Sequence, residues 1–109
     1  MMKTSASILI CLSSLLPGLS VASASADLDG AVLYKMKVCD SCHGEDGTHP
    51  VTPEYPVIAG QPVPYLLRQM KDIRDGRRTN GLSETMRAAV GAVTDEEFRA
   101  IAEWLASRW

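Results

Sequence analysis

Apolar side chains recur at helical spacing in three stretches of the chain. The first stretch covers residues 29–38, and the second covers 65–75, preceded by Pro64 and followed by Gly76. Proline suits the first turn of a helix and glycine suits its end, so both boundaries of the second stretch are marked. Both stretches are therefore predicted to form amphipathic helices that bury one face. Their apolar positions are Val32, Leu33, Met36, Leu66, Met70 and Ile73.

The third stretch, residues 94–107, carries the clearest helix signal. Thr94 and Glu97 have the spacing of a capping box, in which each side chain accepts a hydrogen bond from the other residue's backbone. Acidic side chains in the first turn also favour the positive end of the helix dipole. The face expected to be buried consists of Phe98, Ile101, Ala102 and Leu105.

The remaining segments are predicted to be loops. Between residues 44 and 64, eight positions are glycine or proline, and residues 77–85 are polar. A short helix is predicted for 86–90, and no segment shows the alternation that is typical of a strand. The predicted fold class is therefore all-α, with three to four helices joined by long loops.

The N-terminal segment has the pattern of a secretory signal peptide. A basic start precedes an apolar run over residues 8–16, and small residues follow up to Ala26. Cleavage is expected after Ala26, with Ala24 as second choice, which gives a signal at 1–26 and one domain at 27–109. The apolar run is too short for a comfortable membrane span, although an uncleaved anchor is the alternative. The predicted location is the periplasm, without stable membrane insertion.

Charge and composition narrow the function classes. The 109 residues include 11 basic and 13 acidic ones, for a net charge of −2, and the only clustered positive charge is at 77–78. This pattern excludes a basic surface for nucleic acid. With one phenylalanine, the small domain has few large apolar residues, so a bound group is expected to complete its core.

Two cysteines and a histidine stand together in the segment CDSCHGEDG at 39–47. Cys11 would leave with the signal peptide, so Cys39 and Cys42 remain and do not make a disulfide framework. A structural zinc site needs a second pair of ligands, which the chain lacks apart from His49. A thiol–disulfide site normally opens a helix that follows a strand, and no strand is predicted here.

The spacing Cys-x-x-Cys-His is the signature of c-type haem attachment. Two intervening residues let Cys39 and Cys42 form thioethers with the two vinyl groups of the porphyrin, and His43 then binds the iron as proximal ligand. The predicted cofactor is one covalently attached haem c. The porphyrin would also supply the apolar mass that the small core lacks.

Five segments together resemble class I bacterial cytochromes c, closest to the small monohaem c553-like and c4-type domains. They are CDSCHGEDG at 39–47, YPVIAGQ at 55–61, YLLRQMKDIRDGRR at 65–78, Met86, and TDEEFRAIAEWLAS at 94–107. The resemblance implies the cytochrome c fold, in which an N-terminal helix crosses a C-terminal helix beside the haem. Gly30 and Tyr34 match the family's small-then-aromatic crossing pair. The residues that they would meet are Ile101, Trp104 and Leu105.

The resemblance also implies which residues contact the haem. Pro56 matches the proline whose carbonyl accepts the proton of the haem histidine, a bond that fixes the ring. Ile58 would pack on the haem, and Arg78 and Asn80 would meet a haem propionate. An ordinary solvated charge pair is the alternative explanation for Arg77 and Arg78.

The second axial ligand of the iron has four candidates in the sequence. Met36 and Met70 fit the apolar faces of their helices, so they are expected to be core residues. His49 shares a loop with His43. Met86 follows the middle helix in a polar context and matches the family's axial methionine. His43 and Met86 are therefore the predicted metal ligands.

These features predict a one-electron carrier and not an enzyme, because histidine and methionine would occupy both axial positions. The protein would dock briefly on redox partners through an apolar patch at the haem edge. The expected partners are a donor dehydrogenase or cytochrome complex and an acceptor oxidase or reductase, with the chain as a monomer or as a subunit of a complex. The alternative is a cytochrome subunit of a dehydrogenase complex, for instance with a flavoprotein. A more distant alternative is a haem-free thiol oxidoreductase or metal-binding module.

Overall fold

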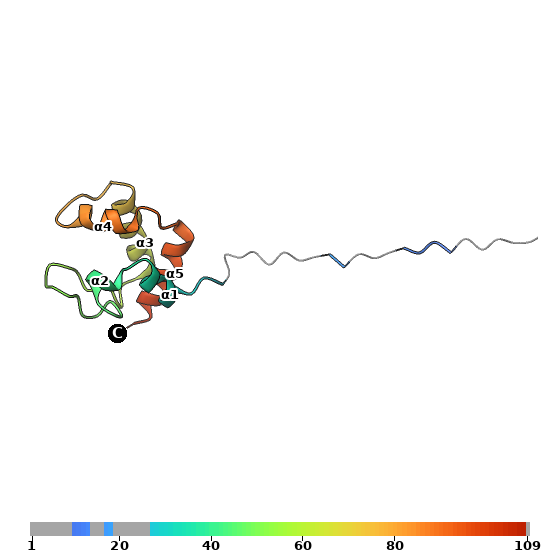
Figure 1. Ribbon diagram of the computed structural model, residues 1–109, viewed down its shortest axis with the longest axis horizontal. Coiled ribbons are helices and arrows are strands. Elements are labelled where there is room, and N and C mark those ends of the chain that lie inside the picture. Colours follow the sequence, from blue (N-terminus) through green and yellow to red (C-terminus); the bar gives the residue numbers. More distant parts are fainter. Residues whose placement is uncertain (1–9, 14–16, 19–26, 109) are drawn as a thin grey trace, which may run out of the picture.

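The computed structural model describes residues 10–13, 17–18 and 27–108. Both predicted cleavage positions, Ala24 and Ala26, lie outside these residues, as does most of the predicted signal peptide. No helix within the described stretches is long and apolar enough to cross a membrane. The helices gather at one end of the chain, in the part coloured from teal to red (Figure 1).

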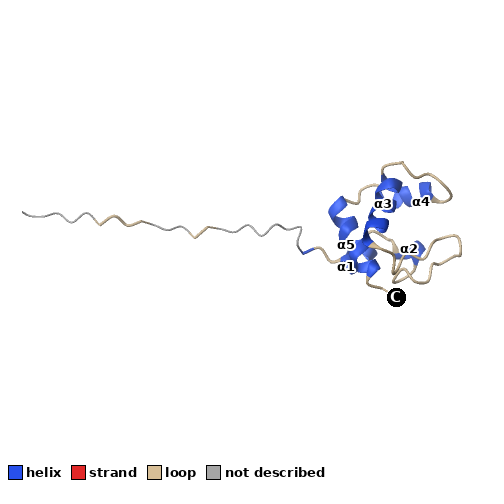
Figure 2. Cartoon of the chain, turned by 180° about the vertical axis from the view of Figure 1, so that it is seen from behind, coloured by secondary structure: helices blue, strands red, loops and turns tan. Residues whose placement is uncertain are grey.

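Residues 27–108 contain five helices and no strand. Figure 2 shows the helices in blue and the loops that join them in tan. The helices are α1 (Gly30–Met36), α2 (Asp40–His43), α3 (Val63–Arg74), α4 (Ser83–Val90) and α5 (Asp95–Ala106). A long connection separates α2 from α3, as the density of glycine and proline predicts. The all-α fold class is confirmed, with one helix more than expected. The additional helix, α2, is a single turn and too short to leave a periodic pattern in the sequence.

The start of α4 differs from the prediction. The helix begins at Ser83, although residues 77–85 are expected to be a polar loop. The Met86 N–H donates to the Leu82 carbonyl at 3.1 Å, so these polar residues form the first helical turn. Glu84 in that turn lies at the positive end of the helix dipole, which suits an acidic side chain. Polarity alone therefore did not distinguish a first helical turn from a loop.

The other boundary signals are confirmed. α3 begins at Val63, two residues before the predicted start, and ends at Arg74. Gly76 follows with a φ of +76°, the left-handed conformation in which glycine commonly stops a helix. At the start of α5, Thr94 and Glu97 form both hydrogen bonds of the capping box.

The helices α1 and α5 lie against each other although they are the first and the last helix in the sequence (Figure 1). Gly30 makes this close approach possible, because a Cβ atom there would lie 2.1 Å from the Ala100 carbonyl oxygen. Tyr34 packs on Trp104, with ring centroids 5.0 Å apart. Since α3 also packs on α5, the last helix is the centre of the core. The implied crossing of the first and last helices is thus present.

The buried face of α5 is the predicted one, whereas α1 buries a different face. The buried residues of α5 are Phe98, Ile101, Ala102 and Leu105. In α1, Leu33 and Tyr34 enter the core, while Val32 and Met36 are 52% and 68% exposed. Placing Met36 in the core was therefore wrong. A two-turn helix with apolar residues on more than one side does not reveal which side meets its neighbour.

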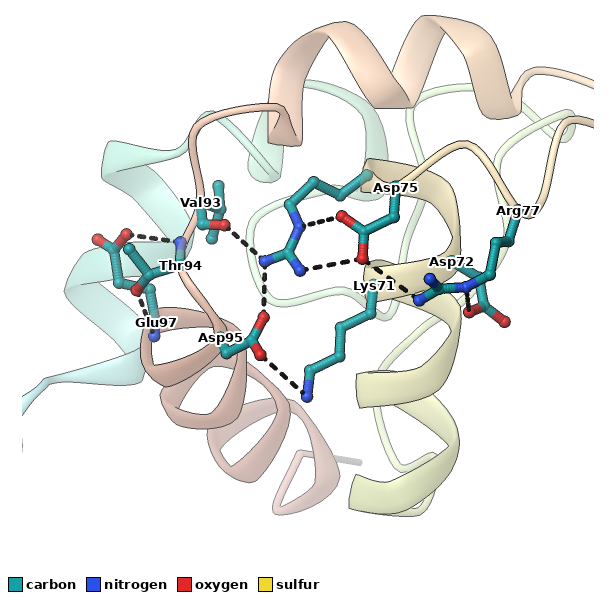
Figure 3. A network of polar contacts seen from close by, with 9 residues as sticks. Lys71, Asp72, Asp75, Arg77, Val93, Thr94, Asp95 and Glu97 are labelled. Carbon is teal, nitrogen blue, oxygen red and sulfur yellow. Dashed lines mark hydrogen bonds and ion pairs between the residues drawn. The ribbon is translucent and has the colours of Figure 1, made fainter.

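A network of ion pairs ties the end of α3 to the start of α5 (Figure 3). Arg74 donates to the Asp75 carboxylate at 2.8 and 3.2 Å and lies 2.7 Å from Asp95 Oδ1. The same guanidinium donates to the Val93 carbonyl at 3.0 Å. Lys71 adds a second cation 3.4 Å from Asp95. The network therefore holds the connection between α4 and α5 against the end of α3.

Candidate functional site

A cavity of about 540 Å³ lies between the helices, and all five helices contribute to its walls. Its volume falls in the range of cofactor pockets. Each of the predicted site residues lines this cavity, although they are spread over nearly half of the chain. They are Cys39, Cys42, His43, Pro56, Ile58, Arg78, Asn80 and Met86. The fold thus brings together all eight residues predicted to bind the cofactor.

The turn before α2 presents both cysteines to the cavity. Val38 has a φ of +56°, Cys39 is the N-cap of α2, and Cys42 lies within that helix. Burial raises the pKa of the Cys39 thiol to about 11. A thiol that stays protonated at neutral pH is a poor nucleophile. Cys39 therefore lacks the low pKa that activates the attacking cysteine of a thiol–disulfide site.

The buried ring of His43 is held by one hydrogen bond. Its Nδ1 lies 3.0 Å from the carbonyl oxygen of Pro56. Because a carbonyl oxygen only accepts, Nδ1 carries the proton and Nε2 keeps its lone pair for a metal. Burial lowers the pKa of His43, although the bond to Pro56 opposes this effect. The result is a neutral and oriented imidazole, the form in which histidine binds metals.

Two of the four candidates for the second axial ligand line the cavity. Met86 of α4 and Met70 of α3 contribute to its walls, while Met36 and His49 do not. His49 is exposed, and its Nδ1 lies 2.8 Å from Thr48 Oγ1. Met70 belongs to the buried core, whereas Met86 is partly buried at the edge of that core. The thioethers available to a bound metal are therefore those of Met70 and Met86.

Arg77 and Arg78 have different surroundings although they are adjacent. Arg77 pairs with Asp72 at 3.0 Å, so the ordinary ion-pair explanation fits this residue. Arg78 lines the cavity and donates to Asn80 Oδ1 at 3.0 Å and to Gln69 Oε1 at 2.9 Å. Among the described residues, no carboxylate lies within ion-pair distance of Arg78. A guanidinium that has only neutral partners can pair with an anionic group bound in the cavity.

Sequence reasoning missed three polar residues of the site. Gln69 follows Leu66 by three positions on the buried face of α3, and that placement was a usable signal for it. Tyr55 lies with its ring centroid 6.3 Å from that of His43. The Ser83 hydroxyl is buried and has no hydrogen-bond partner within the described protein. The places of Tyr55 and Ser83 in the cavity depend on how the loop after α2 and the start of α4 pack against other elements, so the sequence pattern held no sign of them.

The lining of the cavity fits a large apolar group that carries a metal and anionic substituents. The wall formed by α2 offers two thiols and an imidazole, α4 offers a thioether, and Arg78 offers a counter-charge. An isolated metal ion fits less well, because no group of three or more His, Cys, Asp or Glu side chains gathers in the described parts of the chain. The unpartnered Ser83 hydroxyl also fits an occupant that brings hydrogen-bond acceptors. These are the features of a c-type haem site.

Comparison with known proteins decides the family. A family model described as cytochrome c matches residues 28–109. The chain belongs to the cytochrome c family. This membership confirms the resemblance found in the sequence.

Three known proteins are similar in sequence to this cytochrome c. Cytochrome c4 of Pseudomonas aeruginosa is 42% identical over 74 residues, which cover 68% of this chain and 35% of that protein. Cytochrome c-554(548) of Halomonas halodenitrificans is 35% identical over 74 residues, which cover 68% of this chain and 88% of that protein. A thiosulfate dehydrogenase electron acceptor of Stutzerimonas stutzeri is 35% identical over 80 residues, which cover 73% of this chain and 37% of that protein. The chain thus spans about a third of the length of the cytochrome c4 relative.

Membership also establishes the cofactor. It is a covalently attached haem c with its iron. The zinc and thiol–disulfide alternatives for the cysteine motif are thereby set aside.

Proposed function

We propose that this cytochrome c is a periplasmic one-electron carrier whose haem iron is bound axially by His43 and Met86. The observation that supports this proposal is the convergence of both residues, together with Cys39 and Cys42, on one cavity. When bound, the haem supplies an iron couple that accepts and releases one electron. The protein supplies attachment, axial ligands and a surrounding of low polarity.

Each residue of the site has a defined part in this proposal. Cys39 and Cys42 tether the porphyrin through thioethers. The bond from His43 Nδ1 to the Pro56 carbonyl fixes the ring and raises the donor strength of Nε2. Ile58 packs on the haem face.

Two polar residues of the proposed site act on the haem propionates. Arg78 and Asn80 bond to each other and both line the cavity. The Arg78 charge would offset a propionate, and Asn80 would hold the guanidinium in place. This arrangement keeps the negative charge of the propionates compensated next to an apolar cavity.

Met86 is the better candidate for the second axial ligand. Met70 is packed among buried residues of α3 and α5, where its thioether fills the core. Met86 stands at the edge of the core on α4, where Ser83 and Thr85 also line the cavity. A thioether ligand favours ferrous iron and raises the reduction potential, which suits an electron carrier.

Export to the periplasm is proposed from residues 1–26. The basic start, the apolar run and the small residues before Asp27 have the pattern of a cleaved signal peptide, with cleavage after Ala26 or Ala24. Attachment of haem to both cysteines also leaves no reactive thiol in residues 27–109, which suits an oxidising compartment.

Docking on redox partners is proposed to use the apolar rim of the cavity. This rim consists of Val38, Val57, Tyr65 and Leu82, which line the cavity and are exposed. A small apolar contact of this kind gives brief and weak complexes, as fast electron exchange requires. The partners are other redox proteins, a donor dehydrogenase or cytochrome complex and an acceptor oxidase or reductase.

A second candidate function is that of a cytochrome subunit of a dehydrogenase complex. It is favoured by the relative named thiosulfate dehydrogenase electron acceptor. Native purification separates the two candidates. A tight 1:1 complex with a dehydrogenase supports the subunit, whereas a free cytochrome supports the shuttle.

The ligand assignment is tested by Met86→Ala in the exported holoprotein. Intact mass first establishes one attached haem and the N-terminus in the wild type. Loss of the thioether is then expected to lower the reduction potential and to let ferrous iron bind carbon monoxide at neutral pH. Met36→Ala is the matched control, because Met36 is exposed and does not line the cavity. An unchanged potential and no carbon monoxide binding in Met86→Ala would refute the assignment.

A further inference from the structure

Tyr34 contacts both ends of the haem-attachment segment. Its backbone carbonyl accepts a hydrogen bond from the Cys39 N–H at 3.0 Å. Its side-chain hydroxyl donates to the carbonyl of Gly44, the residue directly after His43, at 2.6 Å. One residue of α1 therefore holds the first cysteine and the residue after the axial histidine.

The side chain of Tyr34 is completely enclosed by the protein. It is 0% exposed, and its ring packs on Trp104 of α5. The hydroxyl therefore acts from a fixed position in the crossing of α1 and α5. A hydrogen bond from a donor in a fixed position also restricts its acceptor. The acceptor here is the carbonyl of the peptide group that follows Gly44.

The backbone at His49 approaches Gly44 closely from its other side. Gly44 has a φ of +84°, and a Cβ atom there would lie 2.0 Å from the His49 carbonyl oxygen. The residue is buried, so its carbonyl needs a donor within the protein. The Tyr34 hydroxyl is that donor. Without it the carbonyl would remain unpaired or would admit water next to His43.

We propose that the Tyr34 hydroxyl is a positioning group for the axial histidine. It fixes the backbone on the C-terminal side of His43, while the Pro56 carbonyl fixes the imidazole ring. The two bonds together define the orientation of His43 toward the cavity. This inference rests on the proposed role of His43 as axial ligand.

The test compares Tyr34→Phe with Ser107→Ala in the holoprotein. Tyr34→Phe keeps the ring and the backbone bond but removes the hydroxyl. Ser107→Ala is the matched control, because it also removes a hydroxyl that donates to a backbone carbonyl at 2.6 Å, that of Trp104, while Ser107 is exposed and does not line the cavity. The readouts are the reduction potential and the proton NMR shifts of the ferric haem methyl groups, which depend on the plane of the axial imidazole.

Tyr34→Phe is expected to shift the pattern of methyl resonances and to lower the reduction potential. The potential falls because water near the freed Gly44 carbonyl stabilises the more highly charged ferric state. Ser107→Ala is expected to leave both readouts as in the wild type. A Tyr34→Phe variant that only loses thermal stability, with an unchanged methyl pattern and potential, would overturn the proposal.

A second variant keeps the test decisive if Tyr34→Phe does not mature. The chain has three tyrosines, so Tyr34 is the only one left in the double variant Tyr55→Phe/Tyr65→Phe. Fluorotyrosine incorporated there replaces Tyr34 alone, and it strengthens the hydroxyl as a donor without removing it. Relative to the unlabelled double variant, the potential is expected to shift upward. No shift would contradict the proposal.

The proposed function fails on a different measurement. It fails if the wild-type protein has no attached haem by mass, or if His43→Ala keeps the wild-type haem spectrum. The positioning role of Tyr34 fails only when those wild-type properties are present and the hydroxyl has no effect on them.

Discussion

At the residue scale, Val38 stands in a conformation that side chains of its type avoid. Its φ of +56° lies in the left-handed region, directly before the first cysteine of the motif. A β-branched side chain crowds the backbone there, at a cost of about 1–2 kcal/mol. The turn reverses the chain after α1 and brings Cys39 to the cavity wall. The strain is therefore located at the entry to the haem-attachment segment.

Val38→Gly is expected to increase the free energy of unfolding of the holoprotein by about 1 kcal/mol. Glycine adopts positive φ without steric cost, and the 52% exposed valine side chain loses little packing. Denaturant unfolding followed by circular dichroism measures the change. Val51→Gly is the control, because Val51 is 60% exposed and its φ is not positive, so no gain is expected there. Equal changes in the two variants would argue against strain at Val38.

At the element scale, the crossing of α1 and α5 depends on one missing side chain. At Gly30 a Cβ atom would lie 2.1 Å from the Ala100 carbonyl oxygen and 2.7 Å from Trp104 Cβ. Neither neighbour can move aside, because one is helix backbone and the other is the root of a side chain. An added methyl group would therefore push the helices apart and disturb the packing of Tyr34 on Trp104.

Gly30→Ala is expected to decrease the free energy of unfolding by about 1–3 kcal/mol, the usual cost of overpacking a helix contact. Gly91→Ala is the matched control. Gly91 is exposed with a helical φ of −56°, and a Cβ there meets only the Arg87 carbonyl oxygen at 3.4 Å. The control is expected to gain up to about 1 kcal/mol through the lower entropy of its unfolded chain. A stabilised Gly30→Ala variant would show that the helices separate freely.

At the scale of the whole molecule, the ion-pair network links the end of α3 to the start of α5. Hydrogen bonds from Arg74 hold the pKa values of Asp75 and Asp95 below their ordinary value of 3.8. In the unfolded chain both carboxyl groups return to that ordinary value. Because the folded pKa is the lower one, the pairs stabilise the fold above about pH 4. That stabilisation is lost as the pH falls through the folded pKa values.

Acid titration is therefore expected to decrease the free energy of unfolding below about pH 4, and added salt is expected to weaken this dependence. Asp95→Asn is expected to be less stable than the wild type at pH 7 and to lose stability less steeply in acid. Glu103→Gln is the control, because Glu103 is exposed and has no ion-pair partner among the described residues. Thermal unfolding at a series of pH values measures both. An acid dependence that is the same in Asp95→Asn and in the wild type would exclude this network as its source.

Most of the fold class and of the site was predictable because it depends on short-range chemistry. The capping box of Thr94 and Glu97, the stop at Gly76 and the buried stripe of α5 each involve residues within a few positions of one another. The spacing of Cys39, Cys42 and His43 likewise indicates haem attachment without reference to any other part of the chain. The sequence by itself therefore determined the longer helices and the cofactor, and it named eight residues that the fold brings to one cavity.

Only the tertiary structure decided which surfaces meet. In α1, Leu33 and Tyr34 form the buried face because that face packs against α5. Val32 and Met36 remain exposed. The tertiary structure also placed Met70 and Met86 in the cavity wall and left Met36 and His49 outside it.

The same reason explains the contacts that no pattern revealed. Gln69 beside Arg78 and the Tyr34 hydroxyl on Gly44 join residues nine and ten positions apart through folded backbone. Local propensity acts within a turn or two of chain, whereas these bonds exist only after distant segments have packed around one core. The sequence determined which groups are present, and the packing of α1, α3 and α4 on α5 determined which of them touch.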